Sequence, residues 1–250
     1  MYTQTLREMG IEIVDTIPAL LERVDVVFLE TNDGRPHLEQ VIPVLEAGKP
    51  VFVDKPLAGS LADCIAIFEA AEKHGVPLFS SSSLRYGVET QKVRAGSIGK
   101  VLHCETSGSV SIEPTHPDLF WYGIHGVEAL FTMMGTGCQS VRRYTEDGKI
   151  VVEGKWEGGR VGIFRQGSYG GIAKGSQGEN TEVGKSAGYK PLVEECVKFF
   201  RTAKPPVSAA ETLEIYAFMV AADESKRQEG AEVSLESVMK KARGQGSGER

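Results

Sequence analysis

Two short stretches of the sequence carry residues that could do chemistry. In the first, VFVDKPLAG, an apolar run ends abruptly on Asp54, Lys55 and Pro56. A buried strand needs no charge pair at its tip, whereas ligands of α/β sheets bind just past the carboxyl ends of the strands. Because Pro56 keeps Lys55 extended, the lysine can reach a substrate hydroxyl or a ribose. A solvated turn with a local ion pair is the alternative interpretation.

The second stretch, WYGIHGVE, lies in the middle of the chain. On a helix, Tyr122, His125 and Glu128 stand three residues apart and share one face. The carboxylate could then orient the imidazole and raise its basicity, which suits a general acid or base. Gly123 and Gly126 would leave the backbone open to a ligand. The alternative is a packed helix whose histidine only makes hydrogen bonds to neighbouring residues and has no role in ligand binding.

Two further residues are candidates by their position. His37 lies at a strand-to-helix connection, where it could line a cofactor crevice or cap the helix. Arg85 follows the last predicted parallel strand, where it could meet a phosphate or carboxylate, or simply lie at the surface.

The stretch GTGCQS, from Gly135, is the nearest match to a phosphate-binding turn. It follows a helix and leads into a strand, which is the reverse of a dinucleotide turn, so we interpret it as a helix C-cap.

The elements that would position these residues alternate in the first half of the chain. Apolar runs predict strands, and three-and-four spacing predicts helices that start at Pro36 and after Ser60. The strands are predicted at Ile11–Val14, Asp25–Glu30, Val51–Val53 and Pro77–Ser80, and the helices at Met1–Gly10, Ile17–Arg23, Pro36–Ala47 and Leu61–His74. Strand, helix and strand at these spacings indicate a parallel sheet of βαβ units.

The second half changes character. Between Gln139 and Gly175, short strands are broken by glycine turns, a pattern typical of antiparallel hairpins. The other predicted elements are a strand at Val101–Val110 and helices at Phe120–Met134, Lys190–Thr202 and Ala209–Gln228. We therefore predict an α/β chain with a partial Rossmann domain (1–84), an α+β domain with an open antiparallel sheet (85–243) and a disordered tail (244–250).

Bulk composition excludes some functions. The chain has 250 residues, 41% of them hydrophobic, and a net charge of −6 without a basic block, which argues against nucleic-acid binding. Its apolar runs are too short to span a bilayer, and its polar start does not look like an export signal. The cysteines have neither a disulfide framework nor zinc spacing, which predicts buried thiols in a reducing compartment such as the cytoplasm. A metal hydrolase is disfavoured because no ligands cluster.

Three segments resemble one known family. EAGKPVFVDKPLAGSLADCIAIFEAAEKHGVPLFSSSSLRY is similar to the E/D-K-P segment and following βαβ unit of the glucose–fructose oxidoreductase/inositol dehydrogenase (Gfo/Idh/MocA) family. YGIHGVEALFTMMG resembles the G-x-H helix of its second domain, and the stretch from VKFFRTAKPP to AEVSL its C-terminal helices. The resemblance implies a Rossmann domain, an α/β domain with an open sheet that often forms dimers, and hydride transfer between NAD or NADP and a sugar or polyol.

The resemblance also implies residue roles. Lys55, within the Asp54–Lys55–Pro56 cofactor-side segment, would lie by the nicotinamide and contact the reacting hydroxyl, and His125 would be the acid/base group. Tyr122 and Arg85 would line the substrate side, and His37 the cofactor side.

Two departures from the family pattern matter. The family often has an Asp four residues before the histidine, where this chain has Trp121. No strand–GxGxxG–helix unit precedes the segments above, so we expect a truncated oxidoreductase with impaired cofactor binding, in which DVVFLE becomes an exposed edge. The competing hypothesis is a non-catalytic binding or assembly module, which has no reason to retain both Lys55 and His125.

Overall fold

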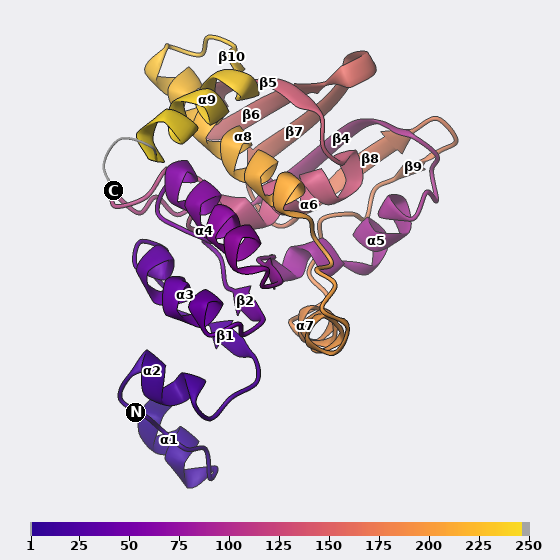
Figure 1. Cartoon of the computed structure of the whole chain (residues 1–250). Coiled ribbons are helices and arrows are strands. Elements are labelled where there is room, and N and C mark those ends of the chain that lie inside the picture. The colour runs from indigo at the N-terminus through magenta and orange to yellow at the C-terminus, as the bar shows by residue number, and fades with distance from the viewer. Residues whose placement is uncertain (1, 247–250) are drawn as a thin grey trace.

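The computed structural model describes residues 2–246, which form a mixed α/β structure with two sheets (Figure 1). The helices are α1 (Tyr2–Glu8), α2 (Ile17–Leu21), α3 (His37–Glu46), α4 (Leu61–His74), η1 (Ser83–Tyr86), α5 (Val88–Arg94), α6 (Gly123–Met134), η2 (Glu157–Gly159), α7 (Lys190–Thr202), α8 (Ala209–Arg227) and α9 (Leu235–Gly246). The strands are β1 (Val27–Leu29), β2 (Val51–Val53), β3 (Leu78–Phe79), β4 (Val101–Gly108), β5 (Cys138–Glu146), β6 (Lys149–Trp156), β7 (Arg160–Gln166), β8 (Gly170–Gly175), β9 (Glu179–Asn180) and β10 (Val233–Ser234).

The smaller sheet is parallel, with the strand order β1-β2-β3. This arrangement confirms the predicted βαβ units, since α3 and α4 connect the three strands. Parallel strands place their carboxyl ends at one edge, so the residues after β1, β2 and β3 converge there. In the described sheet β1 is an edge strand, and its Phe28 is 45% exposed, as the sequence predicts for DVVFLE.

Local signals fix the helix that follows β2. The Ser60 hydroxyl accepts the backbone N–H of Asp63 at 3.0 Å and so caps α4, while Gly75 ends it in the left-handed conformation at φ 65°. A serine cap and a left-handed glycine are the standard start and stop of a helix, because each satisfies backbone groups that the helix itself cannot. The predicted range of this helix is therefore confirmed.

A helix from far along the chain covers one face of the small sheet. Phe52 and Phe79 pack against Phe199 of α7, with the Phe79 and Phe199 ring centroids 4.8 Å apart. Figure 1 shows α7 at the level of the small sheet, below the start of α8. The C-terminal part of the chain thus completes the core of the N-terminal part.

The larger sheet has seven strands in the order β10-β5-β6-β7-β4-β8-β9. Its strands β5, β6 and β7 form the predicted hairpins, but β4 lies between β7 and β8 and runs parallel to β7. The predicted antiparallel sheet is therefore mixed. One glycine pair of this stretch, Gly170–Gly171, does not form one of the predicted glycine turns, because these residues begin β8 and pair with Ser107 and Thr106 of β4.

Helix α6 lies on one face of this sheet and carries His125. The Thr106 hydroxyl of β4 donates to the Gly126 carbonyl of α6 at 2.9 Å, so helix and strand nearly touch. A Cβ at Gly126 would lie 2.4 Å from a ring carbon of Phe164, which is fully buried. Close packing therefore explains this glycine, and the expectation of backbone left open for a ligand is wrong there.

We expect Gly126→Ala to destabilise the chain by about 1–3 kcal/mol, because the added methyl overpacks a buried aromatic ring. Urea unfolding would measure the change. Gly178→Ala is the matched control, since its Cβ would meet only a carbon of Ile98 at 4.0 Å. Equal stability of the two variants would contradict the prediction.

The ends of the chain differ from the prediction. No strand forms at Ile11–Val14, and no described strand lies beside these residues to pair with them. Helix α9 is missed by the sequence analysis and continues through Gly246, into the range expected to be a disordered tail. Residues 247–250 of that predicted tail lie outside the described residues. The predicted boundary near residue 84 stays a prediction, although every described strand of the small sheet precedes it and every one of the large sheet follows it.

Candidate active site

The structure brings Lys55 and His125 together from the two halves of the chain. The Lys55 ammonium lies over the ring of Tyr122, 5.5 Å from its centroid, and that ring lies 5.9 Å from the imidazole of His125. The positive charge of Lys55 is close enough to lower the pKa of His125. Three of the predicted site residues therefore form one group, in which Tyr122 neighbours both of the others.

The loop after β2 is held from both sides. The Asp54 N–H donates to the Leu29 carbonyl of β1 at 2.9 Å, and the Leu57 N–H donates to the Tyr216 hydroxyl of α8 at 2.5 Å. Between them the Lys55–Pro56 peptide bond is cis. Burial raises the pKa of Asp54, partly offset by a hydrogen bond from the Lys55 backbone. The loop that carries Lys55 is thus anchored to the small sheet and to a distant helix.

The partner of His125 differs from the prediction. Its Nδ1 lies 2.7 Å from the hydroxyl of Ser82, in the connection between β3 and η1. Glu128, predicted to orient the imidazole, instead accepts the Ser81 hydroxyl and the Ser82 N–H, both at 2.7 Å. The predicted pairing fails, although both residues lie in α6, because the Glu128 carboxylate binds Arg85 and the Ser81–Ser82 segment. The run of four serines at 80–83 is the sequence signal that could have identified this partner.

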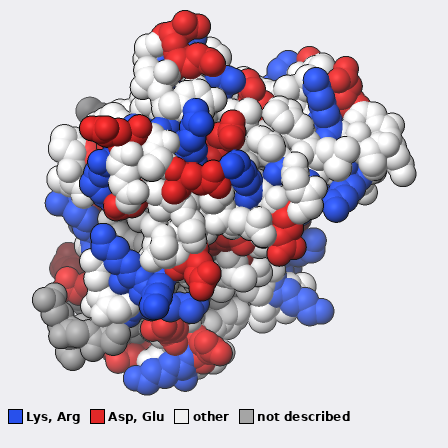
Figure 2. Space-filling model, turned by 90° about the horizontal axis from the view of Figure 1, so that it is seen from above, with Lys and Arg blue, Asp and Glu red and all other residues white. Residues whose placement is uncertain are grey.

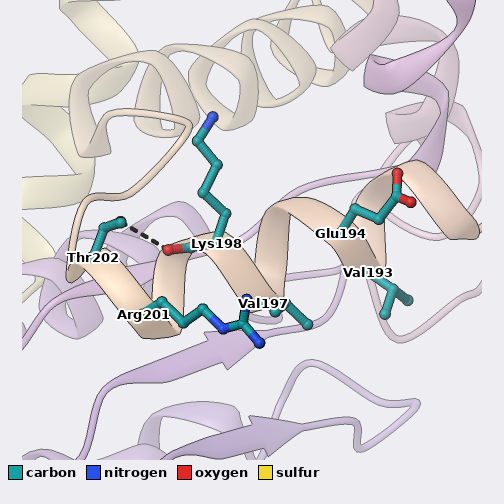
Figure 3. A pocket seen from close by; sticks show the side chains of 6 residues that line it. All are labelled: Val193, Glu194, Val197, Lys198, Arg201 and Thr202. Carbon is teal, nitrogen blue, oxygen red and sulfur yellow. Dashed lines mark hydrogen bonds between the residues drawn. The ribbon is translucent and has the colours of Figure 1, made fainter.

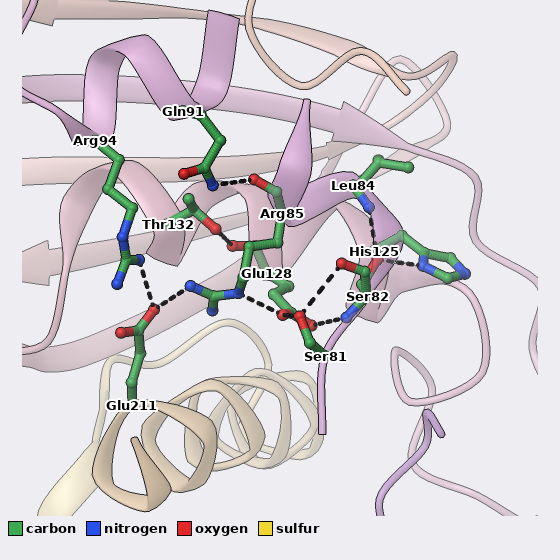
Figure 4. A network of polar contacts seen from close by, with 10 residues as sticks. All are labelled: Ser81, Ser82, Leu84, Arg85, Gln91, Arg94, His125, Glu128, Thr132 and Glu211. Atoms are coloured by element: carbon green, nitrogen blue, oxygen red, sulfur yellow. Dashed lines mark hydrogen bonds and ion pairs between the residues drawn. The ribbon is translucent and has the colours of Figure 1, made fainter. Parts of the chain in front are cut away.

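Arg85 lies behind the site in a buried ion network (Figure 4). Its Nε donates to Glu128 and its Nη1 to Glu211 of α8, both at 2.7 Å, and its side chain is only 2% exposed. Arg94 approaches Glu211 from the surface at 3.3 Å. Since the Arg85 guanidinium is sealed between two carboxylates, it holds Glu128 in place and does not face Lys55. Its predicted contact with substrate has no support in this geometry.

His37 also lies behind the site. The ring is fully buried, with Nδ1 3.2 Å from the Leu57 carbonyl and Nε2 2.8 Å from the Thr31 carbonyl. It therefore ties the loop after β1 to the loop after β2. The sequence analysis expected His37 to line a cofactor crevice. A ring enclosed in this way instead positions the Lys55 loop.

A polar cluster that the sequence analysis did not assign lies beside the loop after β1. The Nε2 of His116 is 3.3 Å from Asp33, whose carboxylate also binds Arg35. The Trp121 ring packs on His116 with centroids 5.3 Å apart. At the position where the family often has an aspartate, this chain therefore has an aromatic side chain that packs on a neighbouring loop.

The pKa of His125 is lowered to about 4, mainly by burial and secondarily by the charge of Lys55. Between its ordinary value of 6.5 and about 4, the unfolded chain therefore binds a proton that the folded chain does not. Stability contributed by the neutral imidazole is complete above pH 6.5 and falls as the pH falls to about 4, by roughly 3 kcal/mol.

We expect this loss to be smaller in His125→Gln, which cannot titrate. Urea unfolding of both proteins at pH 7 and pH 4.5 would measure the difference, since all other groups contribute equally to both. Parallel losses of stability in the two proteins would contradict the lowered pKa.

Other hollows lie at the surface, away from Lys55 and His125. A hollow on α7 is lined by Val193, Glu194, Val197, Lys198, Arg201 and Thr202 (Figure 3). Acidic and basic side chains are interspersed on the face seen in Figure 2. The part of the chain that the structure describes has no cluster of three or more metal-ligating side chains and no helix suited to crossing a membrane. All four cysteines are buried, free thiols, as predicted.

Comparison with known proteins relates the N-terminal part of this chain to one family. Residues 3–82 match the Gfo/Idh/MocA model, described as an oxidoreductase family with an NAD-binding Rossmann fold. This N-terminal segment is similar to the Gfo/Idh/MocA family. Inositol 2-dehydrogenase 3 of Saccharopolyspora erythraea is 38% identical over 104 residues, which are 39% of this chain and 29% of that protein. Inositol 2-dehydrogenase of Gluconacetobacter diazotrophicus is 40% identical over 96 residues, which are 36% of this chain and 28% of that protein.

Solved structures extend the likeness in fold to nearly the whole of this chain. An oxidoreductase from Thermotoga maritima has a TM-score of 0.77 at 18% identity, covering 94% of this chain and 87% of that one. An oxidoreductase from Agrobacterium radiobacter, solved with NAD+, L-tartaric acid and magnesium, has a TM-score of 0.74 at 17% identity, covering 94% and 88%. The matched segment spans less than a third of the curated relatives' length, so their activity is not carried over here.

Proposed function

We propose that the chain is an NAD(P)-dependent oxidoreductase acting on a hydroxyl or keto group of a sugar or polyol. The observation that supports this most is the meeting of Lys55, Tyr122 and His125 at the carboxyl edge of the small parallel sheet. A positive side chain and an imidazole next to each other suit a substrate whose oxygen gains or loses a proton as its carbon is oxidised or reduced. The curated relatives named inositol 2-dehydrogenase favour a polyol.

The residues present fit the nicotinamide side of a dinucleotide. A bound nicotinamide would supply hydride transfer, and the protein would supply orientation and electrostatics. In this proposal Lys55 contacts the reacting oxygen, Asp54 and Pro56 shape the loop beside the cofactor, and His37 holds that loop from behind. Tyr122, which is 41% exposed, shields one side of the substrate. The sequence contains no strand–GxGxxG–helix unit to receive the pyrophosphate, so we expect weakened cofactor binding.

Calorimetric titration with NADH and NADPH, followed by absorbance assays with myo-inositol and other polyols, tests both parts. We expect a Kd weaker than about 10 μM, which corresponds to roughly 7 kcal/mol, and turnover that depends on the cofactor. Tighter binding would refute the impaired cofactor site. Absence of turnover with every polyol at saturating cofactor would support the alternative, a non-catalytic module of the same fold.

The large sheet offers a surface for self-association. Helices α6 and α8 pack on one face, whereas His103, Glu105 and Ser107 of β4 lie partly exposed on the other. We propose that a homo-oligomer forms through this face. Light scattering at several concentrations would measure the mass, and a monomer at all of them would exclude the proposal.

A further inference from the structure

The hydroxyl of Ser82 has few partners. Ser82 is 1% exposed, and its Oγ makes two hydrogen-bond contacts among the described residues. It accepts the backbone N–H of Leu84 at 3.1 Å, and it lies 2.7 Å from Nδ1 of His125. The other ring nitrogen, Nε2, has no protein partner in the described chain and is not sealed off from solvent. Nε2 is therefore the atom that His125 can offer to a ligand.

Counting donors and acceptors fixes the direction of the bond between Ser82 and His125. A serine hydroxyl has one proton to donate, and a neutral imidazole has one N–H and one acceptor nitrogen. Because Leu84 presents a donor, Nδ1 is the one acceptor within reach of the Ser82 proton. If Nδ1 carried the ring proton, the Ser82 proton would be buried without a partner, which native structures avoid. The satisfied arrangement has Ser82 donating to Nδ1 and the ring proton on Nε2.

The charges around the ring favour its neutral form. His125 is the third residue of α6, where the positive end of the helix opposes an imidazolium. The positive charge of Lys55, on the loop after β2, also disfavours protonation of the ring and so lowers its pKa. The ring centroids of Tyr122 and Tyr169 lie 5.9 and 6.2 Å from that of His125. Glu128, one turn along the helix, is engaged by Ser81, Ser82 and Arg85. Among residues 2–246, therefore, no carboxylate pairs with the imidazole.

We infer that Ser82 holds His125 as the Nε2–H tautomer, so that His125 presents a hydrogen-bond donor, and not a proton acceptor, to an oxygen of the ligand. This inference deepens the proposed function and rests on it for the nature of that oxygen, a carbonyl or an alcohol. The lowered pKa agrees with it, because the ring then stays neutral above about pH 4. Neutral histidines at helix N-termini polarise carbonyl groups in this way. His125 would thus be an electrophilic group in place of the acid/base group expected from the resemblance, and the proton gained or lost by the reacting oxygen would pass from or to the Lys55 side chain.

Nitrogen NMR of the chain labelled at histidine, without ligand, tests the tautomer directly. We expect the His125 signals, assigned by their loss in His125→Gln, to show a protonated Nε2 and an unprotonated Nδ1 from pH 5.5 to 8. We expect Ser82→Ala to shift the Nδ1 signal and mix the tautomers. The matched control is Ser83→Ala, which removes a neighbouring hydroxyl that makes no hydrogen bond to the ring. A protonated Nδ1 in the wild type, or an unchanged spectrum in Ser82→Ala, would overturn the inference.

Activity provides a second test that separates donor from proton acceptor. A glutamine amide can donate as Nε2–H does but does not titrate, whereas leucine can do neither. We expect His125→Gln to keep kcat/KM within about 10-fold of wild type and His125→Leu to lose about 10²–10³-fold. Equal losses in both variants would overturn the donor role. Because the NMR result needs no turnover, failure of the proposed function would leave this inference tested on its own.

Discussion

Replacing Arg85 with Met is expected to destabilise the chain by about 3–5 kcal/mol, a large part of the stability of a typical domain. The guanidinium contacts Glu128 and Glu211 at 2.7 Å, and these side chains are 5% and 10% exposed. Removing the cation leaves two carboxylates in an environment that water barely reaches. Urea unfolding at pH 7 would measure the change, since the midpoint should fall well below that of the wild type.

Arg94→Met is the matched control for this prediction. Arg94 pairs with the same Glu211 at 3.3 Å, but its side chain is 37% exposed. A pair of this kind contributes about 0–1 kcal/mol. Similar losses in the two arginine variants would show that burial does not govern this network. A triple variant, Arg85→Met with Glu128→Gln and Glu211→Gln, should recover part of the loss because no unpaired charge is then left inside.

Replacing Lys55 with Met is expected to lower kcat/KM by about 10²–10⁴-fold under the proposed function. Met keeps most of the length of the side chain and its contact with Tyr122, but it removes the positive charge beside the reacting oxygen. Steady-state rates with the polyol that gives the highest turnover would measure the effect. Unfolding should change little, because the lysine tip makes no ion pair among the described residues.

Lys49→Met serves as the control for the loss of one lysine, because Lys49 precedes β2 at the opposite end of the strand. Lys55→Arg adds a finer comparison, since it keeps the charge but changes its shape and reach. A Lys55→Met variant with wild-type kcat/KM would remove the lysine from the chemistry, whatever the other residues do.

The sequence predicted the elements better than the contacts between them. The ranges of β2, α4 and α7 are correct because their apolar spacing, the Ser60 cap and the Gly75 stop act locally. The place of β4 between β7 and β8 could not be predicted in this way, because strand order depends on contacts distant in sequence. Helix α9 does carry a helical signal, since Leu235, Val238 and Ala242 recur at three and four residues and are buried, but the sequence analysis did not use it.

For the site, too, local features were predicted better than contacts between distant parts of the chain. Lys55 and His125 were identified from their own neighbours in the sequence, and the fold brings them together. Ser82, by contrast, is a donor to the histidine only because β3 ends beside α6, across 43 residues of sequence. Arg85 and His37 were assigned to ligand contact because a sequence shows that a residue is near a strand end but not whether its side chain turns inward.

The anchoring of the Lys55 loop by Tyr216 has a consequence for selectivity. The Lys55 loop is bound to α8 through the hydrogen bond from Leu57. His125 contacts Ser82, which in turn donates to Glu128. Arg85 binds Glu128 and also donates to Glu211 of α8. The Lys55 loop and the His125 helix are thus both held by hydrogen bonds to α8, and they cannot move apart without breaking buried hydrogen bonds. Under the proposed function, the separation of Lys55 and His125 is therefore fixed, and we expect compact, rigid polyols to react faster than long, flexible ones.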